Sequence, residues 1–126
     1  GRITVVRALT AHDCGFPINP LLVEGQIDGQ VSMAAGQALS EEVVMEGALT
    51  VNPSFLEYKM PLSTEMVANE YIEVITEEYR KDHHFHTKEV GEGYVSAILA
   101  AIANAVYNAV GFRARKLPIR LPLKKN

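Results

Sequence analysis

The stretch that decides the fold is NPLLVEGQIDGQVSMAAGQA, which runs from Asn19 to Ala38. Asn19 is a residue type that caps helix N-termini, and Pro20 suits the first helical position because an N–H there would have no intrahelical partner. The pattern therefore predicts a helix from Pro20 to about Ala38. Each of its three glycines costs roughly 1 kcal/mol relative to alanine. We therefore expect another group to approach the helix backbone closely at Gly25, Gly29 and Gly36.

Strands are expected on both sides of this helix, because the flanking segments are short and either rich in β-branched residues or alternating in polarity. They cover residues 3–9, 41–45, 48–51 and 71–77. The pair Glu46-Gly47, between the second and third of these, is typical of a hairpin turn. A second helix is predicted over residues 94–110, with Gly111 as its C-cap. Two helices packed on a mostly antiparallel sheet place the chain in the α+β class.

The predicted second helix is apolar over most of its length, which approaches the length that spans a membrane. Ser96, Asn104 and Asn108 interrupt it, and alanine makes up much of the rest. We therefore expect a buried core helix and no membrane span.

The composition is that of one globular domain without a sulfur-based site. The chain has 126 residues, of which 48% are hydrophobic and 21% charged, and Cys14 is its single cysteine. This length can bury a core, and one cysteine excludes a disulfide framework or an iron–sulfur cluster held by this chain alone. No basic segment followed by an apolar one opens the sequence, so no signal peptide is expected. From the start at Gly1, directly before strand-like residues, we expect a piece of a longer protein.

Charge is divided unevenly along the chain. Residues 1–112 carry six Lys or Arg and fifteen Asp or Glu, whereas residues 113–126 carry six Lys or Arg and no acid. Basic segments can bind nucleic acid, but this one is interrupted by leucine and proline and has no aromatic residues between its charges. We therefore predict no nucleic-acid partner, and we expect an extended arm that packs on an acidic neighbouring surface.

Two short clusters carry reactive side chains but match no specific site pattern. Within residues 83–86, His84 and His86 fall on one face of a strand, yet no acid or cysteine stands at a finger-like spacing. We favour a solvated loop and predict no metal site. Cys14, which follows a histidine and an aspartate, would be a nucleophile only in a setting that stabilises its thiolate. A buried structural thiol is the favoured interpretation.

One face of the first helix is rich in amides. Residues spaced i, i+4, i+7 and i+11 share this face, namely Gln26, Gln30, Met33 and Gln37. An amide side chain offers two donors and an acceptor, which suits a ligand with alternating donors and acceptors such as the edge of a pterin. A solvent-exposed helix face, or a face that contacts another segment of the chain, explains the same spacing equally well.

Glu92 lies between two glycines, immediately before the second helix, in the segment Lys88-Glu89-Val90-Gly91-Glu92-Gly93. Glycine permits close approach and unusual backbone angles on both sides of this acid. Such a setting is compatible with a catalytic carboxylate. An acid at a helix N-terminus is also a favourable partner for the helix dipole, and from the residues alone this capping role is the favoured one.

Four segments occur in a characteristic order. They are His12-Asp13-Cys14-Gly15 leading to Ile18-Asn19-Pro20, then Gly25-Gln26-Ile27-Asp28-Gly29, then Glu57-Tyr58-Lys59-Met60-Pro61, then Lys88-x-Val90-Gly91-Glu92. Their order and separation resemble the C-terminal part of the molybdenum-binding subunit of the xanthine dehydrogenase/aldehyde oxidase family. The resemblance extends over nearly the whole chain and is carried by the ordered set rather than by any single motif.

The resemblance implies roles for three residues. Gln26 matches a glutamine that hydrogen-bonds the molybdopterin cofactor, Glu92 matches the family's catalytic glutamate, and Gly91 helps to frame the pocket. Members hydroxylate an sp² carbon of an N-heterocycle, or an aldehyde carbon, with oxygen from water. Iron–sulfur clusters, with or without FAD, belong to other domains or subunits, and the cytoplasm is the usual location. No residue of this chain is expected to ligate the metal.

The resemblance also implies that residues 1–126 are a C-terminal subdomain of a longer subunit. Because the family's cofactor site is assembled from several distant segments, the chain alone is expected to be inactive and to bind no molybdopterin tightly. The expected partners are the remainder of the subunit, iron–sulfur and FAD subunits, and a small-molecule substrate.

Two other functions stay open at this point. One is a subunit of the 4-hydroxybenzoyl-CoA reductase type, with which the turn at residues 12–15 and the stretch at 105–111 are compatible. The other is a non-catalytic interaction domain, in which the basic arm docks a partner and Glu92 only caps a helix.

Overall fold

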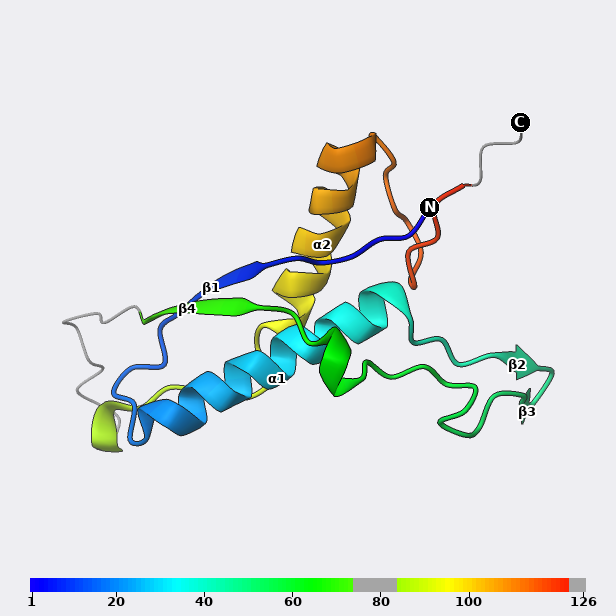
Figure 1. Cartoon of the computed structure of the whole chain (residues 1–126). Coiled ribbons are helices and arrows are strands. Elements are labelled where there is room, and N and C mark those ends of the chain that lie inside the picture. The colour runs from blue at the N-terminus through cyan, green and yellow to red at the C-terminus, as the bar shows by residue number, and fades with distance from the viewer. Residues whose placement is uncertain (74–83, 123–126) are drawn as a thin grey trace.

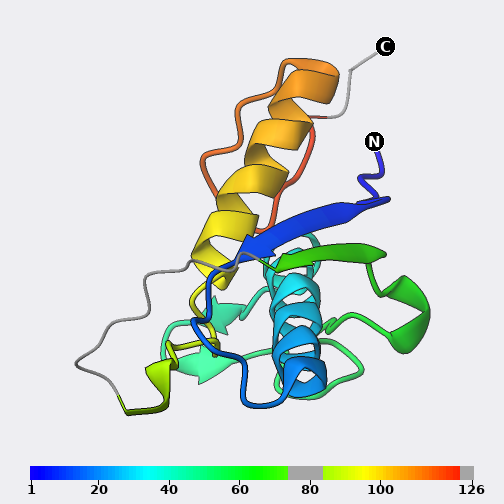
Figure 2. The same cartoon turned by 90° about the vertical axis from the view of Figure 1, so that its left-hand side faces the viewer.

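The computed structural model describes residues 1–73 and 84–122. Two helices form its centre, α1 (Pro20–Leu39) and α2 (Val95–Val110). A pair of strands, β1 (Ala8–His12) and β4 (Asn69–Glu73), lies beside α1 (Figure 1). The view turned by 90° shows this pair lying over α1, beside the first turns of α2 (Figure 2). The predicted α+β arrangement of two helices with small sheets is confirmed.

Helix α1 begins where the sequence predicts. Asn19 is the N-cap, and its side-chain oxygen accepts a hydrogen bond from the Leu22 N–H at 3.2 Å, while Pro20 is the first helical residue. At the other end, the Ser40 N–H donates to Gly36 O at 2.8 Å. The predicted helix is therefore confirmed, and it is one residue longer than expected.

The glycines of α1 differ in their surroundings. A Cβ at Gly36 would lie 2.7 Å from Pro61 Cδ, so a later segment packs directly on the helix backbone there, as predicted. At Gly25 and Gly29 a Cβ would meet nothing within 4 Å. No part of the chain that the structure describes approaches these two positions.

Strands β1 and β4 run parallel, with Ala8 opposite Asn69. The larger of the two sheets therefore differs from the mostly antiparallel sheet that was expected. Between the two strands the chain passes through α1 and returns to the end where β1 began, and such a crossover makes the strands parallel. Strand β1 also begins at Ala8 rather than Ile3. Residues 74–77 of the predicted last strand lie outside the described residues.

The predicted hairpin is confirmed, with shorter strands than expected. It consists of β2 (Met45–Glu46) and β3 (Leu49–Thr50), which pair antiparallel and project beyond the C-terminal end of α1 (Figure 1). Gly47 adopts φ 63° at the turn, a left-handed conformation that glycine takes without steric cost. One short 3₁₀ helix, η1 (Ser63–Glu65), is also present, and η2 (His84–His86) is a turn in which Phe85 and His86 take φ 64° and 54°.

The main core lies where α2 meets α1. Its buried residues are Ala35, Ala38, Ile102, Val106 and Ile119. Only Ile102 and Val106 of α2 are buried, so the expectation of a buried core helix is correct for one face alone. Gly111 takes φ 71°, and its N–H donates to Tyr107 O at 2.7 Å, which confirms the predicted C-cap. Within residues 1–73 and 84–122, neither helix combines the length and the apolar character needed to cross a membrane.

The described part of the basic arm packs on this chain's own α1. The Ile119 N–H donates to Ala38 O at 2.7 Å, and the Arg120 guanidinium donates to Leu39 O at 2.8 Å. These bonds satisfy carbonyls that the end of a helix leaves without intrahelical partners. The Glu42 carboxylate lies 3.9 Å from the Arg120 guanidinium. The described part of the arm therefore meets an acidic group of its own chain, and its expected contact with a neighbouring acidic surface stays a prediction.

Candidate functional site

One side chain joins the N-terminal half of α1 to the turn that leads into α2. Gln30 Nε2 donates to Val90 O at 2.7 Å and to Gln26 O at 3.2 Å, and the Tyr94 N–H donates to Gln30 Oε1 at 2.8 Å. Gln30 is 2% exposed, so its amide serves the chain itself. These bonds hold the backbone on both sides of residues 91–93.

The predicted stripe of three amides is split by this contact. Gln26 is exposed, Gln37 is half-buried and Gln30 is buried. A continuous ligand-facing stripe is therefore wrong, because one of its three amides bonds to the chain's own backbone. Gln26 keeps an exposed amide, beside the bare backbone of Gly25 and Gly29.

Glu92 adopts φ 41°, a left-handed conformation that non-glycine residues take rarely. Its side chain is exposed. The N-cap position of α2 is Tyr94, and no side-chain hydrogen bond caps this helix. The capping role that the residues alone favour for Glu92 therefore does not take the form of a cap hydrogen bond. A Cβ at Gly91 would meet nothing within 4 Å, so the space beside Glu92 is open.

The segments that carry Gln26 and Glu92 lie side by side. Gln26 O and Val90 O accept hydrogen bonds from the same nitrogen of Gln30. The backbone of α1 at Gln26 is therefore adjacent to the backbone two residues before Glu92. Both side chains are exposed.

A second contact connects the same turn to the end of β1. His12 Nε2 lies 3.2 Å from Glu89 O, and His12 Nδ1 is hydrogen-bonded to the Tyr94 hydroxyl, which donates to Ala11 O at 2.6 Å. The two rings pack edge to face, with centroids 4.4 Å apart. Burial, followed by the nearby charge of Asp13, raises the pKa of the Tyr94 hydroxyl, so it stays a neutral donor. No motif points to this pair, because its members stand 82 residues apart.

Cys14 is a buried thiol, as expected for a structural cysteine. It is 4% exposed and belongs to a small apolar cluster with Val23 and Ile27. Its carbonyl accepts a hydrogen bond from the Lys88 N–H at 2.8 Å, and the Lys88 ammonium forms an ion pair with Asp13. The loop after β1 is therefore fastened to the segment that precedes Glu92.

The histidine segment pairs with the same loop. The Phe16 N–H donates to His86 O at 2.9 Å, and Gly15 forms an isolated bridge with Thr87. His83 lies outside the described residues. Over the ranges that the structure describes, no group of three His, Cys, Asp or Glu side chains is placed to hold a metal ion.

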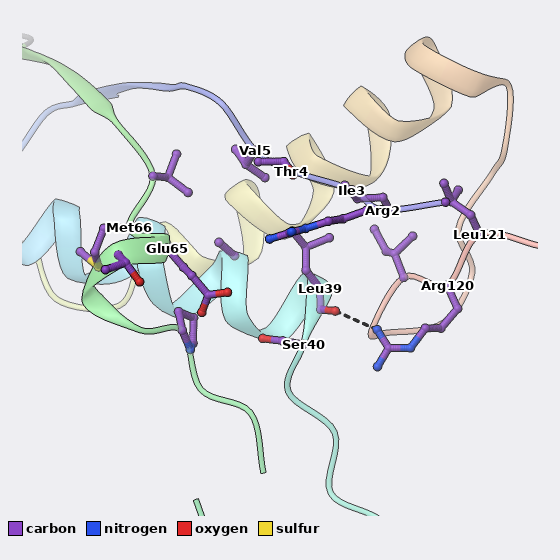
Figure 3. Close-up of a pocket in the computed structure, with 16 residues that line it drawn as sticks. Arg2, Ile3, Thr4, Val5, Leu39, Ser40, Glu65, Met66, Arg120 and Leu121 are labelled. Atoms are coloured by element: carbon purple, nitrogen blue, oxygen red, sulfur yellow. Dashed lines mark hydrogen bonds between the residues drawn. The ribbon is translucent and has the colours of Figure 1, made fainter. Parts of the chain in front are cut away.

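A cavity of about 760 Å³ lies elsewhere, between the N-terminal segment, the end of α1, the residues around η1 and the arm. Figure 3 shows side chains from these segments around it, including Arg2, Leu39, Ser40, Glu65 and Arg120. Neither Gln26 nor Glu92 lines this cavity. The predicted site residues are exposed and lie outside this cavity.

Known proteins resemble this chain in sequence. Residues 1–67 match the family described as molybdopterin cofactor-binding domain. The chain is 35% identical over 122 residues to the xanthine dehydrogenase molybdenum-binding subunit of Escherichia coli O157:H7, which covers 94% of this chain and 16% of that protein. It is 34% identical over 123 residues to the aldehyde oxidoreductase molybdenum-binding subunit of Escherichia coli K12, which covers 96% of this chain and 17% of that protein.

A solved structure agrees in fold. Quinoline 2-oxidoreductase from Pseudomonas putida 86 matches with a TM-score of 0.78 and 27% identity, over 87% of this chain and 14% of that one. The chain therefore spans between 14% and 17% of the length of these three relatives.

Proposed function

Because this chain belongs to the molybdopterin cofactor-binding domain family, we propose that it is the C-terminal part of the molybdenum-binding subunit of a molybdenum hydroxylase. The proposed reaction oxidises an sp² carbon of an N-heterocycle, or an aldehyde carbon, with water as the oxygen source. The names of the relatives support both substrate classes, since they include a xanthine dehydrogenase, a quinoline oxidoreductase and an aldehyde oxidoreductase. Iron–sulfur clusters on other domains or subunits, with or without FAD, and a cytoplasmic location belong to the same proposal.

The large exposed surface supports a place inside a larger subunit. The accessible surface is 9445 Å² for 13.8 kDa, whereas a compact monomer of that mass exposes about 6,600 Å². Large apolar side chains are exposed at many points, including Leu22, Phe55, Leu56 and Leu62. Apolar surface of this kind marks contact regions. We propose that the remainder of the subunit covers it.

The exposed residues near the start of α1 fit a pterin. Gln26 offers two donors and an acceptor, and Gly25 and Gly29 leave the helix backbone beside it bare. Gly91 is open in the same way. The proposal assigns hydrogen bonding of the cofactor to Gln26, and to Gly91 the space that allows close approach.

Glu92 is the proposed catalytic base. The cofactor, when bound, supplies the two-electron redox chemistry. The Glu92 carboxylate takes up a proton at one of its oxygens as a general base, and its exposed position leaves it accessible for this role. The observation that carries the assignment is the backbone at φ 41°, because conformations of this kind in non-glycine residues cluster at functional sites.

Replacing Glu92 by glutamine in the complete enzyme tests the assignment. We expect Glu92→Gln to keep the wild-type molybdenum and pterin content, while kcat falls by about 100-fold or more. The matched control is Glu89→Gln, since Glu89 is an exposed carboxylate three residues earlier in the same turn. A near-normal kcat in Glu92→Gln would overturn the role of Glu92 and favour the non-catalytic interpretation of this turn.

A further inference from the structure

We infer that Gln30 is a positioning residue that sets the place of Glu92, an inference that rests on the proposed role of Glu92 as the base. Gln30 is 2% exposed, so it does not face the open surface itself. It acts through the turn, because its side chain bonds to the backbone before and after residues 91–93.

The two bonds run in opposite directions, which makes the contact specific for an amide. Gln30 donates to Val90 O at 2.7 Å and accepts from the Tyr94 N–H at 2.8 Å. A carboxylate of the same shape accepts from Tyr94 but has no proton to give to Val90 O. A methionine of similar length does neither, and leaves two backbone groups without these partners.

Glu92 needs such support because its own backbone is in a rare conformation. It takes φ 41°, and the glycines on both sides give the local chain many alternatives. A rare conformation persists only where the surrounding structure determines it. Gln30 supplies this constraint by fixing Val90 and Tyr94, each two residues from Glu92.

The same amide also relates Glu92 to Gln26. Gln30 Nε2 donates to Gln26 O at 3.2 Å, one helical turn earlier. One nitrogen atom therefore bonds both to the backbone of the proposed cofactor-binding residue and to the backbone two residues before the proposed base. Loss of these hydrogen bonds is expected to move the Glu92 carboxylate relative to the Gln26 amide. A misplacement of about 1 Å can cost about 100-fold in rate.

Gln30→Glu and Gln30→Met in the complete enzyme test the inference. The matched control is Gln37→Glu, which puts a carboxylate two turns further along the same helix. We expect both Gln30 variants to keep molybdenum content and KM near wild type and to lose about 10- to 100-fold in kcat. Gln37→Glu is expected to retain wild-type kinetics. A raised KM with unchanged kcat would contradict positioning, because it would put the effect in substrate binding.

Hydrogen exchange gives a readout that does not depend on turnover. In the wild-type enzyme we expect the Tyr94 amide to exchange as slowly as amides in the interior of α2, and in both Gln30 variants to exchange faster. Fast exchange at Tyr94 in the wild type would overturn the inference even where the variants do not fold.

The failures of the two proposals are distinguishable. If Glu92→Gln loses turnover while both Gln30 variants keep the wild-type kcat, Gln30 is not a positioning residue and the role of Glu92 stands. If Glu92→Gln keeps the wild-type kcat, both proposals fall.

Discussion

The Tyr58 hydroxyl donates a hydrogen bond to the Glu41 carboxylate at 2.6 Å, and so joins the two ends of the segment that forms the projecting hairpin. Pro61 follows shortly after and packs on Gly36. The chain that leaves the end of α1 is thereby brought back onto the same helix. These two contacts hold the hairpin at its base.

We expect Glu41→Gln to lower the pKa of Tyr58. The hydrogen bond to the Glu41 carboxylate, followed by burial and the negative charge of Glu41, raises that pKa above its usual 10.0. Because the pKa is raised in the folded state, the associated stability is fully present below pH 10.0 and is lost as the pH rises through the folded value. An NMR titration of the Tyr58 ring in both proteins measures the change. An identical titration curve in the variant would show that the carboxylate is not the cause.

Gly36→Ala is expected to destabilise the complete subunit by about 1–3 kcal/mol through overpacking. The added Cβ would lie 2.7 Å from Pro61 Cδ, and the better helix preference of alanine offsets only part of the cost. Asn108→Ala is the control, since it also raises helix preference but lies at an exposed position of α2, away from the proposed cofactor site. Thermal unfolding compares the two. Equal midpoints would contradict the close packing at Gly36.

Arg120→Met is expected to lower stability by about 0.5–1.5 kcal/mol, because Leu39 O loses its hydrogen-bond donor. Lys116→Met serves as the control for removing a nearby charge. The Lys116 ammonium lies 4.0 Å from the Glu42 carboxylate and its side chain is 87% exposed, so we expect no measurable change there. Denaturant midpoints give the comparison, and equal losses in both variants would assign the effect to net charge.

Tyr94→Phe separates the two contacts of the Glu92 turn. It removes the hydroxyl that bonds to Ala11 O and His12, for which we expect a loss of about 1 kcal/mol. It keeps the backbone N–H that donates to Gln30, so kcat should fall less than in Gln30→Glu. Unfolding and steady-state kinetics together check this. An equal fall in kcat would show that the link to β1 positions Glu92.

The chain of residues 1–126, expressed alone, is expected to be inactive and to retain no molybdopterin after purification. The side chains of Gln26 and Glu92 are exposed, and exposed side chains exclude too little water to hold a large polar cofactor tightly. Elemental analysis of the purified chain measures the molybdenum content. Stoichiometric molybdenum would show that these residues suffice for binding.

Local signals in the sequence predicted where elements begin and end. The caps at Asn19 and Gly111 were correct because a cap depends on a few consecutive residues. The expectation of a mostly antiparallel sheet did not include the parallel β1–β4 pair, because that pairing depends on the path of residues 13–68, which no local pattern shows. The exposed face of α2 escaped prediction for a similar reason, since apolar sequence does not show which segment covers it.

The sequence likewise predicted only part of the candidate site. The order of four segments pointed to Gln26 and Glu92, and their roles stay predictions. The sequence spacing placed Gln30 on the same helix face as Gln26, but it did not predict that Gln30 is buried. Its partners stand 60 and 64 residues away, so only the folded backbone shows that this amide, among the three, turns inward.

The contacts that complete α1 also set an order of events during synthesis. Leu39 O receives its hydrogen bond from Arg120, 81 residues later in the chain, and Ile119 fills the core beside Ala38. Since translation proceeds from the N-terminus, the apolar side of α1 leaves the ribosome long before the residues that cover it. We expect the nascent chain to pass through an aggregation-prone stage. Limited proteolysis of ribosome-bound chains of increasing length should show α1 becoming protected only once Arg120 has emerged.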